Sequence, residues 1–215
     1  MNEQGLRERK KERTRQLIAD TARRLFAERG FDAVTVAQIA RDADVAEKTV
    51  FNYFPTKEDL FYSRLEAFED ELLTAIRERQ PGETALDAFA QFMLQPRGVL
   101  AFGDSRDPEA TEQLQTITRV ITESPALLAR ERQVFARYTE SLAALLAGET
   151  RAPAGSVEPV VAANALLGAH RALIDYVRRR TLAGDSAAAI GRGVRSEARK
   201  ALTLLERGLG DYARR

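Results

Sequence analysis

The sequence has no cysteine, no tryptophan and a single histidine, His170, among its 215 residues. Without cysteine there is neither a disulfide framework nor a thiolate metal ligand, and zinc sites draw mainly on cysteine and histidine. We therefore expect no metal and no cofactor. One histidine, no G-x-S-x-G motif and no glycine-rich phosphate loop also leave few groups for a catalytic site, so we expect a protein that is not an enzyme.

Long apolar runs are missing as well. No stretch reaches the roughly 18 apolar residues of a membrane-spanning helix. The basic first residues, MNEQGLRERKKERTRQ, are not followed by the apolar segment of a secretory signal. The sequence thus predicts a cytoplasmic protein with no membrane partner.

Apolar residues nevertheless make up 44% of the chain, enough to build a core. They recur at helical spacing almost throughout, while strand signals are scarce, and this pattern predicts an all-α protein of about nine helices. A long helix is expected to begin at Thr56, which can cap it together with Asp59. Five more helices are expected over residues 83–95, 108–122, 125–148, 156–181 and 185–208.

The N-terminal quarter shows the outline of a small three-helix unit. Residues 15–30 have an apolar helix face, and Gly30 is well placed to end that helix. Thr35 and Gln38 have the spacing of a capping box and start a helix of about two turns. A turn-prone stretch, Asp42–Asp44, separates it from a second short helix. Two short helices joined by a tight turn and packed on a longer first helix form a helix-turn-helix.

The second short helix, Ala46–Phe54, is the one that a helix-turn-helix protein lays in the major groove of DNA. Its polar residues are expected to face outward, and the apolar residues expected to hold it on the other helices are Val45, Val50, Phe51 and Phe54. Lys48 and Thr49 suit contacts with base edges or phosphates, and Tyr53 suits phosphates. The candidate DNA-contacting residues are Thr35, Arg41, Glu47, Lys48, Thr49, Asn52, Tyr53 and Lys57.

Positive charge is concentrated near the N-terminus, although the net charge is only +1. Residues 1–57 contain 12 Lys and Arg against 9 Asp and Glu, a net +3, and residues 58–215 contain 21 against 23, a net −2. Within Arg7–Arg15, six basic residues stand against Glu8 and Glu12. A basic end on a nearly neutral body indicates an anionic partner, such as the DNA backbone or an adjacent minor groove.

The stretch GFDAVTVAQIARDADVAEKTVFNYFPTKEDLF, with TRQLIADTARRLFAERG before it, resembles the N-terminal domain of the TetR family of bacterial transcriptional repressors. The likeness covers about residues 11–61, from the L-F and G-F pairs to the P-x-K-E-x-L tail. It implies that the positions which the family uses for DNA contact are Thr35, Lys48, Thr49, Tyr53 and Lys57. Ala46 departs from the pattern, because the family often has a Ser or Thr cap there, so we expect the recognition helix to lack that hydrogen bond.

The resemblance implies a helix-turn-helix DNA-binding domain of residues 1–55 and a larger helical domain of residues 56–215 for ligand binding and dimerisation. The candidates for an apolar ligand site are Phe89, Phe92, Met93, Phe102, Ile117, Ile121, Phe135, Tyr138, His170 and Leu173. Residues 156–181 are apolar on two sides, which a core and a partner subunit together would cover. The candidates for the homodimer interface are Val160, Asn164, Leu167, Ile174, Val194, Ala198, Ala201 and Leu205.

Residues 124–147 also resemble a subgroup of the family that senses acyl-CoA-like ligands, so the expected effector is small and apolar or acyl-type. The resulting hypothesis is a homodimeric repressor that leaves a pseudo-palindromic operator when the effector binds. An alternative that the sequence leaves open is a helical adaptor that binds a protein or peptide through an apolar groove, without DNA. The choice of repression over activation rests on the family alone.

Overall fold

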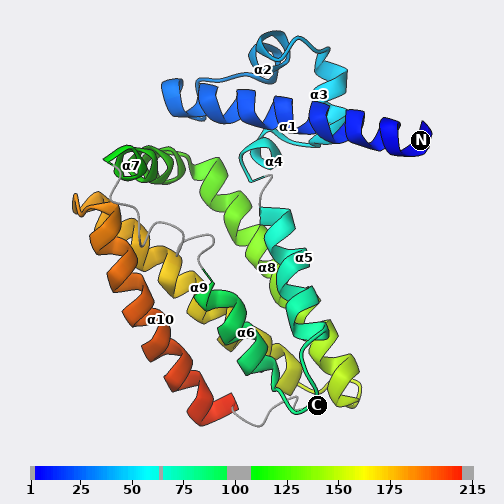
Figure 1. Cartoon of the computed structure of the whole chain (residues 1–215), viewed down its shortest axis with the longest axis vertical. Helices are drawn as coiled ribbons and strands as arrows, with labels where there is room; N and C mark the ends of the chain where they lie inside the picture. Colours follow the sequence, from blue (N-terminus) through cyan, green and yellow to red (C-terminus); the bar gives the residue numbers. More distant parts are fainter. Residues whose placement is uncertain (1–2, 63–64, 96–107, 210–215) are drawn as a thin grey trace. The chain divides into compact units, whose positions relative to one another are not determined.

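A computed structural model of the chain describes residues 3–62, 65–95 and 108–209 (Figure 1). These residues form ten α-helices and contain no strand, which confirms the all-α prediction. The helices are α1 (Glu3–Arg29), α2 (Val36–Asp42), α3 (Glu47–Tyr53), α4 (Lys57–Phe61), α5 (Leu65–Arg77), α6 (Ala85–Leu94), α7 (Pro108–Glu123), α8 (Pro125–Thr150), α9 (Glu158–Leu182) and α10 (Ala187–Leu209). None of these described helices is both long and apolar enough to cross a membrane.

Two helices, α4 and α5, stand where one long helix was expected, and this accounts for ten helices instead of about nine. Thr56 caps α4 as predicted. Its hydroxyl accepts a hydrogen bond from the Asp59 N–H at 3.2 Å, and the Asp59 carboxylate accepts one from the Thr56 N–H at 3.0 Å. α4 ends at Phe61, and the next residue, Tyr62, donates its hydroxyl to the carbonyl of Leu127 at 3.1 Å.

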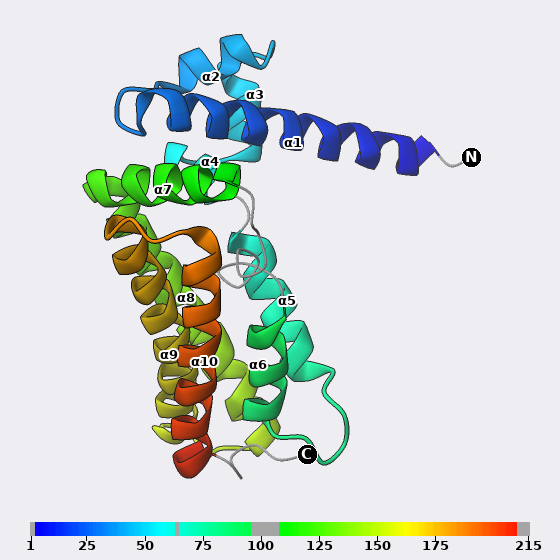
Figure 2. The same ribbon diagram turned by 60° about the vertical axis from the view of Figure 1, so that its left-hand side comes forward.

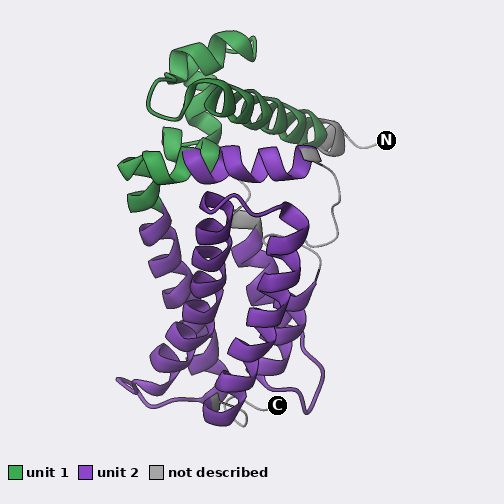
Figure 3. Ribbon diagram, turned by 90° about the vertical axis from the view of Figure 1, so that its left-hand side faces the viewer, with its two compact units in different colours: residues 1–67, 120–130 green, residues 68–119, 131–215 purple. Residues whose placement is uncertain are grey.

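The helices are grouped into two compact units (Figure 3). Unit 1 consists of Met1–Ala67 and Val120–Arg130, and unit 2 consists of Phe68–Arg119 and Glu131–Arg215. Each unit therefore draws on segments that are far apart in the sequence. Unit 1 combines the first four helices with the end of α7 and the first residues of α8.

Unit 1 is built on α1, which runs without a break from Glu3 through the basic segment to Arg29. The apolar pattern predicted this helix only from residue 15 onward. Gly30 ends it as expected: its φ of 81° is a left-handed conformation that glycine adopts without strain, and its N–H donates to the carbonyl of Phe26 at 2.9 Å. The residues of α1 to α4 at the centre of the core include Ile18, Leu25, Phe26, Ile39, Val50, Phe54 and Leu60.

The end of α7 and the first turn of α8 complete the core of unit 1, where Leu127 is fully buried. Two polar contacts secure this segment. The Ser124 hydroxyl donates to Asp32 at 3.0 Å, and the Arg130 guanidinium donates to Asp59 at 2.6 Å. Asp59 is only 9% exposed, so one carboxylate both caps α4 and pairs with an arginine 71 residues away in sequence.

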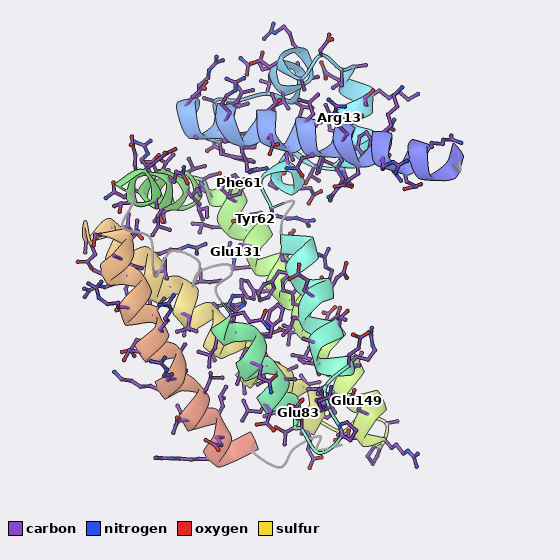
Figure 4. All side chains as sticks on the ribbon, viewed as in Figure 1. Arg13, Phe61, Tyr62, Glu83, Glu131 and Glu149 are labelled. Atoms are coloured by element: carbon purple, nitrogen blue, oxygen red, sulfur yellow. The ribbon has the colours of Figure 1, made fainter. Side chains whose placement is uncertain are left out.

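Two ion pairs with little exposure hold segments of unit 2 together: one joins two helices, and the other joins the loop after α5 to α8. Arg178 of α9 donates to both carboxylate oxygens of Glu131 of α8, at 2.8 and 2.5 Å. The Arg79 guanidinium lies 2.7 Å from a carboxylate oxygen of Glu149 and also donates to the carbonyl of Glu83 at 3.2 Å. Glu83, Glu131 and Glu149 are labelled in Figure 4. Arginine suits such positions because its planar guanidinium can serve several acceptors at once.

The helices α9 and α10 lie side by side within unit 2 (Figure 2). Their close approach depends on a glycine: the Tyr176 hydroxyl of α9 occupies the space that a side chain at Gly193 of α10 would fill. Val194 and Ala198 of α10 are fully buried at the same time. Small residues in α10 thus allow the two long helices to pack closely.

A cluster of rings occupies the core of unit 2. It is formed by Phe68 of α5, Phe92 of α6, Phe135 and Tyr138 of α8, and His170 of α9. The His170 imidazole stacks on Phe68 with ring centroids 4.6 Å apart. His170 is 5% exposed, and its Nδ1 atom has no hydrogen-bond partner among the described residues. Burial disfavours the imidazolium and lowers the pKa of His170 from its ordinary 6.5 to about 4, so the ring is neutral at pH 7.

The neutral His170 makes the stability of the fold depend on pH. Its pKa is lower in the folded chain than in the unfolded chain, so its stabilisation is complete above pH 6.5 and is lost as the pH falls towards 4. Between pH 8 and pH 5, we expect the free energy of unfolding of the native protein to fall by about 2 kcal/mol more than that of His170→Asn. Urea titrations followed by circular dichroism measure both, and equal falls would contradict a buried neutral imidazole.

Candidate nucleic-acid interface

The turn between α2 and α3 fixes the direction in which α3 leaves α2. The Asp44 N–H donates to the carbonyl of Arg41 at 3.2 Å and the Val45 N–H donates to that of Ala40 at 2.9 Å, the two bonds of a Schellman motif. This motif needs a left-handed residue at its bend, and Asp44 has a φ of 53°. Asp adopts that conformation more readily than most residues with a side chain. The predicted turn at Asp42–Asp44 is thereby confirmed.

One side of α3 is held by the core of unit 1. Val50 is fully buried, and Phe54, the C-cap residue, is 2% exposed. Val45, just before the helix, is half-buried against the same cluster. The helix start has no side-chain cap at Ala46, as the sequence indicated. Packing of two buried residues, rather than capping, therefore holds α3 in place.

The other side of α3 faces solvent. Glu47, Lys48 and Asn52 are exposed, and Thr49 and Tyr53 are half-buried. The Tyr53 ring packs partly against the core of unit 1, which orients a phenol that has an apolar body and a polar tip. Together these side chains supply a cation, a carboxylate, an amide and two hydroxyls, which are the groups that contact base edges and phosphates.

Phe51 was expected to pack inward with Val50 and Phe54, and this expectation is wrong, because its side chain is 47% exposed. Successive residues of an α-helix are turned by about 100°. When Val50 points into the core, Phe51 therefore points away from it, and Phe54 returns to the buried side. Phe51 consequently lies beside the buried side, one turn after Lys48, where its ring meets solvent.

Thr35 and Arg41, the two candidates from the first short helix, are both exposed. Thr35 forms the predicted capping box: its hydroxyl accepts from the Gln38 N–H at 3.2 Å, and its N–H donates to the Gln38 side chain at 2.8 Å. Its hydroxyl thus already orders the start of α2. Arg41 lies in the last turn of α2, and its carbonyl accepts the Asp44 hydrogen bond of the turn.

Lys57 has a structural role that its sequence context did not reveal. Its ammonium donates to the carbonyls of Phe31 and Val34, at 2.9 and 3.0 Å, and lies 4.1 Å from the centre of the Phe31 ring. A lysine ammonium has three donors, so one remains for a phosphate. Lys57 therefore stabilises the loop between α1 and α2, whatever contact it makes with DNA.

The basic part of α1 lies beside the end of α3, a proximity that the sequence analysis missed. A hollow of about 340 Å³ is lined by Glu8, Lys11, Glu12, Arg15, Asn52 and Tyr53. The first four residues recur at helical spacing, so they share one side of α1. The Arg15 guanidinium also lies 5.2 Å from the centre of the Phe54 ring. Two cations, two carboxylates, an amide and a phenol thus surround a hollow next to the outward side of α3.

The candidate ligand residues of unit 2 come together in part. Phe92, Phe135, Tyr138 and His170 belong to the ring cluster, and Phe89, Met93 and Leu173 are also buried. Phe68 joins the cluster although it was not a candidate. Ile117 is 46% exposed, and Ile121 belongs to the core of unit 1, because the last turn of α7 packs there. Phe102 lies outside the described residues.

A second hollow, of about 360 Å³, lies on the surface of unit 2 between α5 and α6. Its lining residues are Asp70, Glu71, Thr74, Ala75, Phe92 and Gln95. Phe92 is shared with the ring cluster, so the hollow reaches the edge of the apolar core. Among the described residues there is no group of three His, Asp or Glu that could hold a metal ion.

The candidate dimer residues fall into two groups. Val160 is 49% exposed, Asn164 is also exposed, and Ile174, Ala201 and Leu205 are half-buried. Leu167, Val194 and Ala198 are at most 3% exposed within a single chain, in a unit where α10 packs against both α9 and α6. Those three side chains therefore lie in the core of unit 2 and not on a surface open to a partner.

Comparison with protein families finds two matches along the chain. Residues 18–63 match the family described as bacterial regulatory proteins, tetR family. Residues 96–209, more than half of the chain, match the MftR C-terminal domain. The first match contains α2, α3 and α4, so it includes the candidate DNA-contacting residues.

Individual proteins with similar sequences or folds are also found. The transcriptional regulator TcmR of Streptomyces glaucescens is 30% identical over 68% of this chain and 62% of TcmR. The nucleoid occlusion factor SlmA of Pasteurella multocida is 32% identical over 59% of this chain and 62% of SlmA. The chain thus matches less than two thirds of either relative. GusR of Salmonella enterica has a similar fold, with a TM-score of 0.52 and 22% identity over 92% of this chain and 95% of GusR.

The left-handed residue at the bend predicts how the turn responds to substitution. Asp44→Ala should lower the free energy of unfolding by about 1 kcal/mol, because alanine keeps the Cβ that disfavours this conformation but lacks the short polar side chain with which aspartate tolerates it. Asp44→Gly should be at least as stable as the native protein, because glycine has no Cβ. Urea titrations of the three proteins measure the differences. A glycine variant that is no more stable than the alanine variant would contradict the proposed role of the bend.

Proposed function

The chain belongs to the TetR family of bacterial regulatory proteins, and from this premise we propose that it is a sequence-specific DNA-binding transcriptional regulator. We place its activity in the cytoplasm, where bacterial DNA lies, and we propose that it acts as a homodimeric repressor on a pseudo-palindromic operator. The family is one of regulators, which agrees with the expectation of a protein that is not an enzyme.

The observation that carries this proposal is the two-sided character of α3. Val50 and Phe54 hold one side in the core, while Lys48 and Asn52 are exposed on the other and Glu47 is exposed at the start of the helix. A helix-turn-helix inserts such a helix into the major groove, where side chains on the outward side meet base edges. Lys11 and Arg15 of α1 add cations beside it, which suit the flanking phosphates. An adaptor that binds a peptide through an apolar groove would not need these exposed polar side chains of α3 or the cations of α1.

A homodimer through α9 and α10 is supported by apolar side chains that one chain leaves uncovered. The exposed residues of this kind are Val157, Val160, Val161, Leu182 and Leu204. Gly168 lies on the same side of α9 as Val161 and Asn164, with open space around its Cα. Small residues let a partner helix approach closely. The proposed interface therefore uses these exposed faces and leaves out Leu167, Val194 and Ala198.

The effector is proposed to be a small apolar or acyl-type molecule without a negative charge. The hollow between α5 and α6 has Phe92 at its apolar side and carries the carboxylates of Asp70 and Glu71. Phe92 contacts Phe68, and Phe68 stacks on His170 inside the core. His170 is neutral, and its Nδ1 atom has no partner among the described residues. Two carboxylates and a neutral imidazole favour an uncharged polar group on an apolar chain. Such a ligand lowers DNA affinity if it binds one arrangement of the protein better than another.

Selection from a pool of randomised duplexes tests DNA binding. The native protein should enrich an inverted repeat, and Thr49→Ala combined with Tyr53→Ala should abolish the enrichment, because both side chains lie beside the outward side of α3. The control, Thr116→Ala on α7, should enrich the same repeat. On that duplex, the logarithm of affinity should fall linearly with the logarithm of salt concentration, with a slope of about −0.9 per phosphate contact.

The same duplex tests the homodimer. Sedimentation should give two chains per inverted repeat, and Val161→Arg combined with Leu204→Arg should lower both self-association and affinity for the repeat. A native protein that enriches no sequence, or that binds with no dependence on salt, would rule out the regulator and favour the adaptor. A single chain on the complete repeat would rule out the dimer alone.

Release from the selected operator tests the effector. Dodecanol should displace the native protein at concentrations where dodecanoate does not, because the carboxylate would meet the acidic side of the hollow. His170→Phe keeps a ring in the cluster and removes its hydrogen-bonding atoms, so it should raise the dodecanol concentration needed by about 3- to 10-fold. Fluorescence anisotropy of labelled operator measures release. If both molecules act alike, or if the variant behaves as the native protein does, this effector class is wrong.

A further inference from the structure

Phe51 presents an exposed aromatic ring beside the polar side chains of α3. It is 47% exposed, and its neighbours one turn before it, Glu47 and Lys48, are exposed and charged. Among the described residues, no aromatic ring or cation contacts the Phe51 ring. A large apolar side chain left in water on so short a helix forgoes the stabilisation of burial. On the helix that is proposed to enter the major groove, this ring is a candidate for contact with DNA.

The place of Phe51 on the helix narrows the choice of partner. Residues three and four apart on a helix are neighbours on its surface, so Phe51 lies next to Glu47 and Lys48. Asn52 is exposed beside it. If α3 enters the major groove with Lys48 and Asn52 towards the DNA, the Phe51 ring lies beside these side chains and within reach of the base edges.

The major groove offers one apolar group, the C5-methyl of thymine, and a phenylalanine ring is among the side chains that contact it. We propose that Phe51 contacts the C5-methyl group of one thymine in each half of the operator, and so is a residue that determines sequence specificity. This inference rests on the proposed DNA-binding function. It adds a thymine at one position of each half-site, chosen by an apolar contact and not by hydrogen bonds.

Replacement of thymine by deoxyuridine isolates this contact. The two bases have the same hydrogen-bonding edges and differ by the methyl group alone. Each thymine of the selected operator is replaced in turn by deoxyuridine in both half-sites, and affinity is measured by fluorescence anisotropy at one salt concentration. For the native protein, one symmetric pair of replacements should weaken binding by about 4-fold per half-site, the effect of uncovering a buried methyl-sized group.

Two variants make the assignment specific to Phe51. With Phe51→Ala, the same replacement should change affinity by less than about 1.5-fold, because the ring that met the methyl group is gone. With Asn52→Ala, a neighbour on the outward side of α3, the full loss caused by deoxyuridine should persist. Phe51 is exposed, and circular dichroism of the alanine variant verifies that the fold is retained.

The outcomes separate this inference from the proposed function. If the native protein enriches an operator but no deoxyuridine replacement loses its effect in Phe51→Ala, the thymine contact is wrong and the DNA-binding function stands. If the effect disappears equally in Asn52→Ala, the contact does not belong to Phe51 and the inference is overturned. If the native protein binds no operator, the proposed function and this inference fail together. Loss of self-association in Phe51→Ala without any coupling to the methyl group would assign the ring to a protein partner instead.

Discussion

A helix of seven residues is too short to persist in water by itself, so the orientation of α3 depends on the apolar contact that holds it. Val50 provides most of that contact, with Phe54 just after the helix. Both belong to a core that α1 supplies on one side and the start of α8 completes on another. The polar groups that α3 offers to a partner are positioned by the packing of Val50, Tyr53 and Phe54 against this core, because the helix has no side-chain cap of its own. The recognition surface is thus a product of tertiary packing in unit 1.

Several side chains near this surface combine structural and binding roles. The Thr35 hydroxyl caps α2, and two donors of Lys57 bind the carbonyls of the loop after α1. Such groups are fixed before any nucleic acid arrives, so little side-chain freedom is lost when they contact it. Mutants of these residues are difficult to interpret for the same reason, because a loss of DNA affinity can follow from a loosened loop as well as from a lost contact. Lys48 and Asn52, which only face solvent, are more direct probes of recognition.

The features that the sequence predicted correctly are local ones. The Thr35 and Thr56 capping boxes, the end of α1 at Gly30 and the bend near Asp44 each depend on a few consecutive residues, and all are present. Features that depend on packing between distant segments were not predictable in this way. Three features are of this kind: the exposure of Phe51, the burial of Val194 within unit 2, and the place of Ile121 in the core of unit 1. Apolar periodicity tells which residues avoid water, but it does not tell which neighbour covers them.

The uninterrupted course of α1 has a practical consequence for protein engineering. From Glu3 to Arg29 the helix has no break, and its first half borders the recognition surface. A fluorescent protein or enzyme could be fused to the N-terminal end of α1 through a helical linker that continues this helix. Its orientation relative to unit 1 would then be fixed, whereas a flexible linker would leave it free to rotate. Each residue added to the linker would turn the fused protein by about 100° and advance it by about 1.5 Å. The length of the linker would then determine which side of a bound duplex the fused protein faces.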